Sequence, residues 1–440
     1  MPATPAHTPL LSASTHKGYP AWAPPLPVDE VGQQGWHVLQ PDWPLPCAVI
    51  RAPALRHNLG WMQRLVQQAG VGLAPHGKTT LSPELFQAQL DAGAWGITFA
   101  NVAQLALGVA HGVRHALIAN QVLLPHDLHW LAALLREHPT LQVAFWLDSA
   151  AQLEAVAQAH VGHRLDVLVE LGLPGGRTGC RHHDEALALA RAAHHHPAVR
   201  LVGLACYEGL WAQGDSQADA TLVHGLMQRL HTLARACDDQ GWFNEAPEII
   251  LTAGGSAVFD LVAAQLLPQA EPALSRPVRA LLRSGCYLTH DHGTYQRFAN
   301  PLQRRLTDSG LAGQAWGCGD GLQAALEVWA VVLSCPEPGL AILNAGKRDL
   351  SHDAGLPTPV RWCPSDQRQP LPCPTGWTVS ALNDQHAYLN GVSGSGPMPR
   401  VGDRVALGIS HPCTTFDKWR WMPLVEDHGQ VVGAIRTQFG

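Results

Sequence analysis

Eight short apolar runs constrain the fold of this chain more than any other feature of its sequence. Each run has the character of a strand, ends in polar or turn-forming residues, and is followed by a longer Ala/Leu-rich segment of helical character. The spacing of about 20 to 45 residues leaves room for one crossover helix each time, which is typical of parallel βα units. Eight such units predict a closed (β/α)8 barrel of the TIM type. The runs are VGLAPH from residue 71, GITFAN from 96, HALIAN from 115, VAFWLD from 143, DVLVELG from 166, VGLACYEG from 202, EIILTAGG from 248 and VRALLRSG from 278.

The texture of the sequence changes on both sides of this repeat. Residues 1–45 are rich in Pro, Ala, Ser and Thr, as in YPAWAPPLP, and predict an irregular arm, so we assign residues 46–305 to the barrel domain. Beyond it, short apolar runs separated by Gly, Pro and Asp predict a smaller, mainly antiparallel β domain over residues 306–440. LPCAVIRA, near Cys47, is a candidate strand for pairing with that domain. The runs of the second domain are LEVWAVVLS, LAILNAG, GWTVSALND, DRVALGIS and VVGAIRT.

Composition narrows the classes of function. With 46% hydrophobic residues, a formal net charge of −6 and no basic block, the chain favours small-molecule chemistry over nucleic-acid or membrane-surface binding. No run approaches the ~20 apolar residues that span a bilayer, and the N-terminus lacks the features of a signal peptide, so we expect a cytoplasmic protein. Ten cysteines without CxxC pairs predict mostly reduced, buried thiols.

Active sites of such barrels lie at the C-terminal ends of the strands, so the residues that follow each run are candidates. Lys78, in LAPHGKTTLSPE, follows the first run. The segments after the seventh and eighth runs can bring backbone N–H groups to an anion, at the place where barrels recurrently bind phosphate. A lysine and a phosphate cradle on one rim predict pyridoxal phosphate (PLP), bonded to Lys78 as a Schiff base. The candidate cradle residues are Gly254, Gly255, Ser256, Gly285, Cys286 and Tyr287.

Two further residues reach the same rim. Arg177 follows the fifth run in ELGLPGGRTGC, and Tyr207 ends the sixth in CYEG. We expect Arg177 to support the cofactor ring or its phenolate oxygen, and Tyr207 to lie against the ring. Each of these residues also has an ordinary structural explanation: a solvated lysine, a glycine turn, a structural arginine or a packed tyrosine.

A candidate metal site lies in the second domain, in ISHPCTTFDKWR. His411 and Cys413 are two residues apart after a strand-like run, and such a pair on extended backbone projects to one face. Imidazole and thiolate suit zinc better than magnesium or calcium, and two protein ligands leave room for substrate and water. A chance HxC is the alternative in a chain with 25 histidines. We expect the clusters RHH at 181–183 and HHH at 194–196 to be solvated surface, and Asp384 and His386 to be candidates for the same metal region or simply structural.

Together these segments resemble the D-serine dehydratase and D-threonine aldolase family, fold type III PLP enzymes related to alanine racemase. PHGKT is similar to the family's Schiff-base lysine motif, and AGAWGITFANVAQ, GRTG, YEG, NAGKRDLSHDAGLP and HPC are also similar to family segments, from about Pro46 to the C-terminus. GGSAVFD and RSGCY depart from the family, whose members commonly carry threonine and proline after the glycines and RPGxY at the eighth strand. The resemblance implies Lys78 as Schiff-base lysine, His411 and Cys413 as zinc ligands, and a homodimer with the site near the domain interface.

The HxC form resembles the dehydratases, whereas the aldolases tend to carry HxD and use manganese or magnesium. We therefore expect PLP- and zinc-dependent elimination of water from a β-hydroxy-D-amino acid such as D-serine, giving a 2-keto acid and ammonia. The amine of Lys78 would take the Cα proton, and zinc would act as a Lewis acid on the β-hydroxyl. The alternatives are retro-aldol cleavage of D-threonine or a related substrate to glycine and an aldehyde, racemisation, and PLP binding without catalysis.

Overall fold

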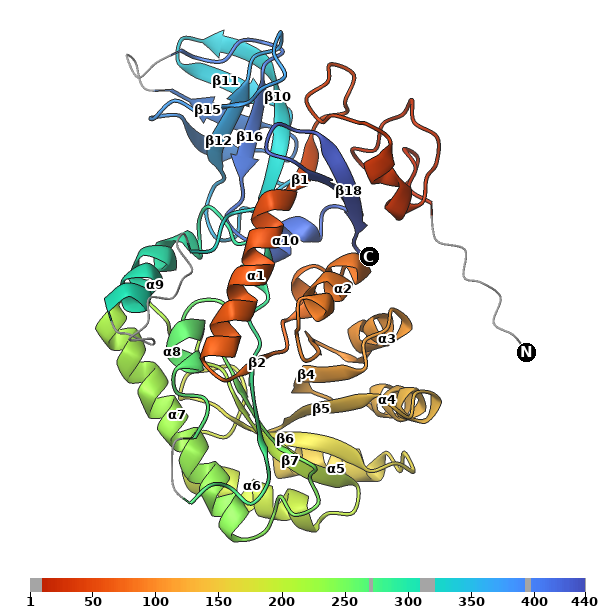
Figure 1. Ribbon diagram of the computed structural model, residues 1–440, viewed down its shortest axis with the longest axis vertical. Helices are drawn as coiled ribbons and strands as arrows, with labels where there is room; N and C mark the ends of the chain where they lie inside the picture. Colours follow the sequence, from red (N-terminus) through yellow and green to blue (C-terminus); the bar gives the residue numbers. More distant parts are fainter. Residues whose placement is uncertain (1–9, 269–271, 309–320, 392–396, 440) are drawn as a thin grey trace, which may run out of the picture.

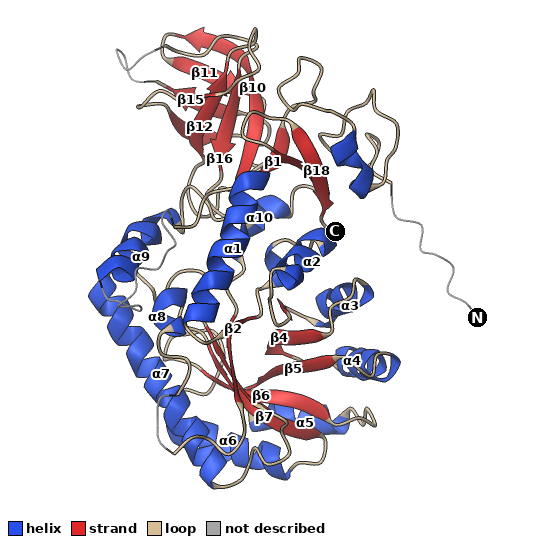
Figure 2. Ribbon diagram, in the orientation of Figure 1, coloured by secondary structure: helices blue, strands red, loops and turns tan. Residues whose placement is uncertain are grey.

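Two sheets organise the molecule, a parallel one curled into a barrel and an antiparallel-rich one above it in Figure 1. The structure is a computed structural model that describes residues 10–268, 272–308, 321–391 and 397–439. The first nine residues of the predicted arm lie outside the described part. Figure 2 shows helices around the barrel and a second domain made almost wholly of strands, as the sequence predicts.

All eight predicted barrel strands are present. Neighbouring strands pair in parallel in the order β2-β9-β8-β7-β6-β5-β4-β3. The two ends of this sheet meet, because Trp95 N donates to Leu73 O at 2.8 Å and Thr98 N donates to Pro75 O at 2.9 Å. The predicted barrel is therefore confirmed. The strands are β2 (Gly72–Leu73), β3 (Ile97–Phe99), β4 (His115–Gln121), β5 (Gln142–Leu147), β6 (Leu165–Leu171), β7 (Val199–Cys206), β8 (Ile249–Ala253) and β9 (Val278–Leu282).

Helices follow the strands and begin at recognisable caps. Asn101 Oδ1 accepts the Gln104 N–H at 2.9 Å, and Asp215 Oδ1 accepts the Ala218 N–H at 2.8 Å, which satisfies otherwise unpaired amides of the first turn. Pro53 and Pro83 occupy first-turn positions, where no N–H is needed. The helices are α1 (Ala52–Gln68), α2 (Pro83–Asp91), α3 (Val102–Ala110), α4 (Pro125–Glu137), α5 (Ala150–Gln158), α6 (His183–His195), α7 (Ser216–Asp239), α8 (Phe259–Ala263) and α9 (Gln296–Asp308).

The second sheet takes strands from both sides of the barrel in the sequence. The candidate strand near Cys47 is β1 (Cys47–Arg51), which pairs antiparallel with β10 (Leu326–Glu337) and parallel with β17 (Trp421–Val425). The five predicted runs form β10, β11 (Leu340–Leu343), β14 (Thr378–Leu382), β16 (Arg404–Gly408) and β18 (Val431–Arg436). Further strands are β12 (Thr358–Cys363), β13 (Leu371–Pro372) and β15 (Ala387–Asn390). The domain boundaries after residues 45 and 305 stay predictions, although β1 itself belongs to the second sheet.

The N-terminal arm is irregular, as predicted, and lies against this second sheet beside β18 (Figure 1). Apart from the 3-10 helix Val28–Gln33, its described part forms no helix or strand. Three of the four aromatic residues in its described part, Tyr19, Trp36 and Trp43, are buried, whereas Trp22 is exposed. The Tyr19 ring lies 5.7 Å from that of Trp36 and 5.2 Å from that of Trp421 in β17. Burial of these large rings anchors the arm to the sheet.

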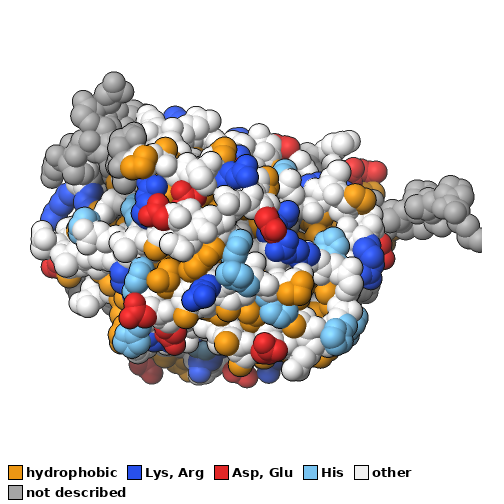
Figure 3. Space-filling view, turned by 90° about the horizontal axis from the view of Figure 1, so that it is seen from below, with side chains coloured by type: hydrophobic (Ala, Val, Ile, Leu, Met, Phe, Trp, Pro, Cys, Tyr) orange, Lys and Arg blue, Asp and Glu red, His pale blue; other side chains and the backbone are white. Residues whose placement is uncertain are grey.

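The surface carries charges of both signs. Figure 3, which views the molecule from below, shows acidic, basic and histidine side chains interspersed, with no continuous basic patch on that face. In the cluster at 194–196, which was expected to be solvated, His195 is exposed, whereas His194 and His196 are half-buried. None of the described helices is long and apolar enough to cross a membrane. The nine cysteines within the described residues are all free.

Candidate functional site

A pocket of about 350 Å³ opens at the C-terminal ends of the barrel strands, where the second domain closes over them. This volume is within the usual range of small-molecule sites. Residues of both domains line it, so the barrel rim and the HPC segment meet, as the resemblance implied. The predicted site residues that line it are Lys78, Arg177, Tyr207, Gly254, Gly255, Ser256, Gly285, Cys286, His411 and Cys413.

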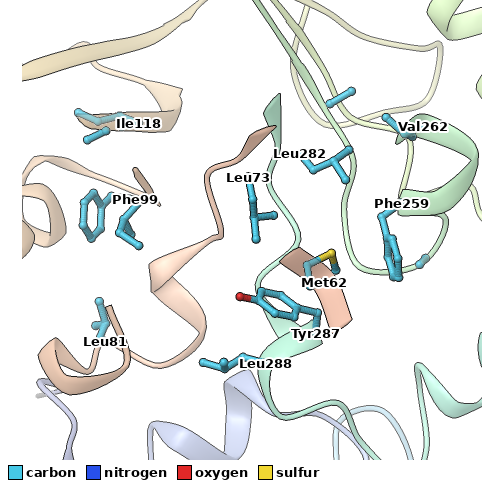
Figure 4. Close-up of a cluster of buried hydrophobic side chains, with 14 of the residues drawn as sticks. Met62, Leu73, Leu81, Phe99, Ile118, Phe259, Val262, Leu282, Tyr287 and Leu288 are labelled. Carbon is cyan, nitrogen blue, oxygen red and sulfur yellow. The ribbon is translucent and has the colours of Figure 1, made fainter. Parts of the chain in front are cut away.

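Tyr287 does not line this pocket. Its side chain is 2% exposed and turns into the core, where its ring lies beside Met62 (Figure 4). Gln89 Nε2 donates to the Tyr287 hydroxyl at 3.3 Å, so the polar end of the ring is also satisfied inside the protein. The side chain is therefore a core element. A contact of its backbone N–H with phosphate stays a prediction.

The backbone around Lys78 is shaped by close packing. A short 3-10 turn, Gly77–Thr79, follows β2 after the three residues 74–76. A Cβ on Gly77 would lie 2.8 Å from Ile97 and 2.9 Å from Phe86, so only glycine lets the turn pack this tightly. The turn directs Lys78 into the pocket, where its Nζ lies 4.0 Å from Cys413 Sγ of the second domain.

The glycines after β8 already have an anionic partner. Glu208, which is fully buried, accepts the Gly254 N–H at 3.1 Å and the Gly255 N–H at 2.7 Å. These two amides were expected to face the cofactor phosphate, and in this structure they bind a carboxylate of the chain itself. Gly254 adopts φ +87°, and a Cβ on Gly255 would lie 2.6 Å from the Tyr207 ring. Both glycines thus shape the loop, and their contact with phosphate stays a prediction.

The remaining cradle residues join the loops after β8 and β9. Cys286 N donates to Ser256 Oγ at 3.2 Å, and Ser284 Oγ donates to Gly255 O at 2.6 Å. A Cβ on Gly285 would lie 2.7 Å from His76 O and from Thr79 Oγ1, so the bare glycine lets this loop approach the lysine turn. An amine, a serine hydroxyl and this glycine loop therefore border one cavity, which fits the needs of a PLP molecule.

Arg177 and Tyr207 contact each other across the pocket wall. The guanidinium of Arg177 lies 5.6 Å from the centre of the Tyr207 ring, a cation–π distance. Burial raises the pKa of Tyr207 to about 12, so its hydroxyl stays protonated at neutral pH. The expected roles of both residues beside a cofactor stay predictions.

The loop that carries Arg177 is held by Arg181, which differs from our expectation of solvated surface. Arg181 Nη1 donates to Gly179 O at 2.8 Å, and its Nη2 donates to Gly176 O at 2.8 Å. Its side chain therefore satisfies backbone carbonyls that the glycine-rich loop would leave unpaired. The sequence does not predict this role, because the carbonyl groups that Arg181 binds are brought to its side chain only by the way the loop folds back.

Other pocket residues were not singled out in the sequence. Arg283, 6% exposed, directly follows β9 and donates to Thr252 Oγ1 at 2.8 Å and to Cys206 O at 2.7 Å. Glu170 is the last residue but one of β6 and accepts from Gln121 Nε2 at 2.7 Å, and burial raises the pKa of its carboxyl. Two features of the sequence could have identified them as pocket residues. Both lie at the ends of predicted strands, and both are charged residues within an apolar run.

His411 and Cys413 come together in the pocket by a route other than the predicted extended strand. β16 ends at Gly408, and Pro412 has helical φ and ψ before the short helix α10 (Cys413–Phe416). Cys286 Sγ lies 3.6 Å from Cys413 Sγ. This contact holds the pKa of Cys413 well below its usual range, and the neighbouring His411 and Lys78 lower it further. The neighbouring Cys413 in turn raises the pKa of His411 to about 9.

An imidazole beside a stabilised thiolate has the donor chemistry that zinc prefers. Among the described residues, no three His, Cys, Asp or Glu side chains are gathered as a metal site. The candidate protein ligands are therefore two, His411 and Cys413. Asp384 is exposed and pairs with Arg348 at 3.7 Å, and neither Asp384 nor His386 lines the pocket. The acidic residue that contacts His411 is Asp353, whose Oδ2 lies 2.6 Å from His411 Nδ1.

Two family models match the chain. One, described as the alanine racemase N-terminal domain, matches residues 50–266, and the other, described as a putative serine dehydratase domain, matches residues 325–425. The first match covers the barrel from α1 to α8, with Lys78. The second covers most of the β domain, with the HPC segment.

Several known proteins are similar over most of the chain. D-threonine aldolase of Arthrobacter sp. is 27% identical over 403 residues, which are 88% of this chain and 92% of that protein. The structure of D-threonine aldolase from Filomicrobium marinum has a TM-score of 0.70 at 22% identity, covering 90% of this chain and 96% of its own. D-threo-3-hydroxyaspartate dehydratase from Delftia sp. has a TM-score of 0.68 at 23% identity, covering 92% and 99%.

That dehydratase has also been solved in two variant forms. One replaces a histidine, and the other replaces a cysteine two positions further along and is described as metal-free. At these identities the structural likeness shows a shared fold, from the barrel through the second sheet.

Proposed function

We propose that this chain, which belongs to the D-serine dehydratase and D-threonine aldolase family with an alanine racemase-like barrel, is a lyase that uses PLP and a divalent metal to cleave a β-hydroxy-D-amino acid. The observation that carries the proposal is the meeting of three groups in one pocket. Lys78 comes from the barrel rim, and His411 and Cys413 come from the other domain. Because the Lys78 amine and the two proposed metal ligands lie in one pocket, they would act on adjacent carbons of one small substrate, the amine at Cα and the metal at the β-hydroxyl.

The chain's own residues supply binding and proton transfer. When bound, PLP would withdraw electrons from the substrate Cα and make its proton acidic. Lys78, whose Nζ faces the pocket, would take that proton. Ser256 and the loop at Gly285 would hold the phosphate, and Tyr207 and Arg177 would border the ring.

His411 and Cys413 would hold the metal, which supplies Lewis-acid chemistry at the β-hydroxyl. The pairing of imidazole with thiolate supports zinc over manganese or magnesium. The dehydratase variants described above, with histidine and cysteine replaced two positions apart and one of them metal-free, support a metal at this pair. We therefore propose zinc-assisted loss of water from a substrate such as D-serine, giving a 2-keto acid and ammonia.

Retro-aldol cleavage is the second candidate. The similarity to D-threonine aldolase of Arthrobacter sp. extends over 88% of this chain, which favours it independently of the metal pair. There the metal would lower the pKa of the β-hydroxyl so that the Cα–Cβ bond breaks, giving glycine and an aldehyde. Homodimer formation and a cytoplasmic location stay predictions.

The link between PLP and Lys78 is tested by absorbance. Purified protein supplied with PLP should show the band of lysine-bound PLP, and Lys78→Ala should lose it. Lys347→Ala is the matched control, because Lys347 is exposed and lies outside the pocket, and it should keep the band. A wild-type protein that stays colourless with PLP would overturn the proposal.

The role of the metal is tested separately. Removing metal with a chelator should stop turnover while the absorbance band remains, because Lys78 and the phosphate loops do not depend on the metal. His411→Ala should do the same, and His195→Ala, on the exposed end of α6, should behave as the wild type. Turnover that survives both chelation and His411→Ala would reject a metal-assisted reaction.

A further inference from the structure

The imidazole of His411 is held from behind by one carboxylate. Asp353 Oδ2 lies 2.6 Å from His411 Nδ1, and the second oxygen, Oδ1, accepts the hydroxyl of Thr414 at 2.6 Å. Asp353 does not line the pocket, whereas His411 does. Both oxygens of this carboxylate are therefore already used in fixing the HPC segment, on the side away from the cavity.

The backbone of the same segment is fixed by a neighbouring serine. His411 N donates to Ser351 Oγ at 3.0 Å, and Ser351 N donates to Thr415 Oγ1 at 3.1 Å. Ser351 Oγ also lies 3.2 Å from Ser410 Oγ. The segment 351–353 thus holds both the main chain and the ring of His411, so the ring has little freedom to rotate.

A ring nitrogen that donates to a carboxylate carries the proton, which leaves the other nitrogen as the metal ligand. We propose that Asp353 is a positioning residue of the metal site, which keeps His411 protonated at Nδ1 and presents its Nε2 to the metal beside Cys413. The carboxylate also makes the imidazole a stronger ligand. Loss of such a partner typically weakens metal binding by about 10- to 100-fold. This inference rests on the proposed metal site and adds a residue to it.

Asp353→Asn tests the inference, because asparagine has the same shape and lacks the charge. The measured quantity is the zinc dissociation constant, obtained by competition with a chelator. We expect the value for Asp353→Asn to rise by about 10- to 100-fold. Asp384→Asn is the matched control: it makes the same chemical change in the same domain, at an exposed residue outside the pocket, and should leave the constant unchanged.

Two further measurements separate positioning from general damage. The PLP absorbance band should be unchanged in Asp353→Asn, because Lys78 is untouched. Cobalt-substituted Asp353→Asn should keep a thiolate-to-cobalt absorption band, which Cys413→Ser should lose. If Asp353→Asn fails to fold, Thr414→Val frees only one carboxylate oxygen and should weaken zinc binding several-fold in the same direction.

The outcomes distinguish this inference from the proposed function. Wild-type affinity for zinc in both Asp353→Asn and Thr414→Val, with the metal lost in His411→Ala, would overturn the positioning role alone. Wild-type protein that binds no zinc, or His411→Ala that keeps wild-type affinity, would overturn the proposed metal site and this inference with it.

Discussion

At the scale of single residues, the loop after β8 depends on a glycine where a ring approaches. A Cβ on Gly255 would lie 2.6 Å from Tyr207, while the Gly255 N–H is held by Glu208 at 2.7 Å. The residue is thus fixed on both sides and has no room to move away. The sequence predicted that this loop binds phosphate, which stays a prediction, and in the structure Glu208 accepts the N–H groups of Gly254 and Gly255 and so holds the shape of the loop.

Gly255→Ala should therefore disturb both stability and cofactor binding. The added methyl must displace the Tyr207 ring, so we expect a loss of about 1–3 kcal/mol in stability and weaker PLP binding. Gly225→Ala is the control, because a Cβ there meets nothing within 4 Å, and alanine in helix α7 should be neutral or stabilising by up to about 1 kcal/mol. Thermal unfolding and PLP titration check this; equal behaviour of the two variants would contradict it.

At the scale of elements, the segment that leads from the barrel to the second domain contains an unusual histidine. His290 has φ +46° and is 4% exposed, and the preceding Thr289 accepts the Ala325 N–H at 2.7 Å through its carbonyl. Burial lowers the pKa of His290 to about 4. The folded state therefore holds this ring neutral at a junction between the two domains.

This buried histidine predicts a dependence of stability on pH. Because the pKa is lower when folded, its contribution is complete above pH 6.5, the value for an unperturbed histidine, and is lost as the pH falls towards about 4. The loss amounts to about 3 kcal/mol. His290→Asn tolerates positive φ and cannot titrate, so its thermal midpoint should fall less between pH 7 and pH 4.5.

Asp291, whose pKa burial raises to about 6, shifts stability in the opposite direction over part of this range. It does so in both proteins, so the comparison between them isolates His290. Parallel pH profiles for wild type and variant would contradict the prediction.

The elements themselves were largely predictable. The barrel strands are continuous apolar runs bounded by turns, and all eight were identified. In the second domain four strands were missed, β12, β13, β15 and β17. Arg361 interrupts β12, Pro423 lies inside β17, and β13 and β15 are only two and four residues long. The pairing of HPC with Asp353 was not predictable, because it depends on where two loops 58 residues apart in sequence meet.

At the scale of the whole molecule, the N-terminal arm supports the loop that leads to Asp353. Lys17 Nζ donates to Asp349 Oδ1 at 3.0 Å and lies 3.7 Å from the centre of the Trp419 ring. Asp349 is almost fully buried and stands four residues before Asp353. The arm was expected to be merely irregular, and it is a structural part of the second domain.

Lys17→Met should therefore destabilise the protein, because it leaves the Asp349 carboxylate buried without its cation. We expect a loss of about 1–3 kcal/mol. Lys418→Met is the control, since Lys418 pairs at 3.4 Å with Asp417, which is exposed, and its loss should cost less than about 1 kcal/mol. Thermal unfolding of both variants tests this prediction. Equal midpoints for Lys17→Met and Lys418→Met would show that the arm does not stabilise the second domain through Lys17.

The central claim is that Lys78 and the metal pair act together on one β-hydroxy-D-amino acid. Product analysis tests it most directly: wild-type protein with PLP and zinc is incubated with D-serine, D-threonine and D-3-hydroxyaspartate, and with the L-forms as controls. We predict equal amounts of a 2-keto acid and ammonia from at least one D-substrate and none from the L-forms, with the reaction stopped by a chelator. Glycine and an aldehyde would instead establish aldol cleavage. No product from any D-substrate, or turnover that ignores the chelator, would contradict the account.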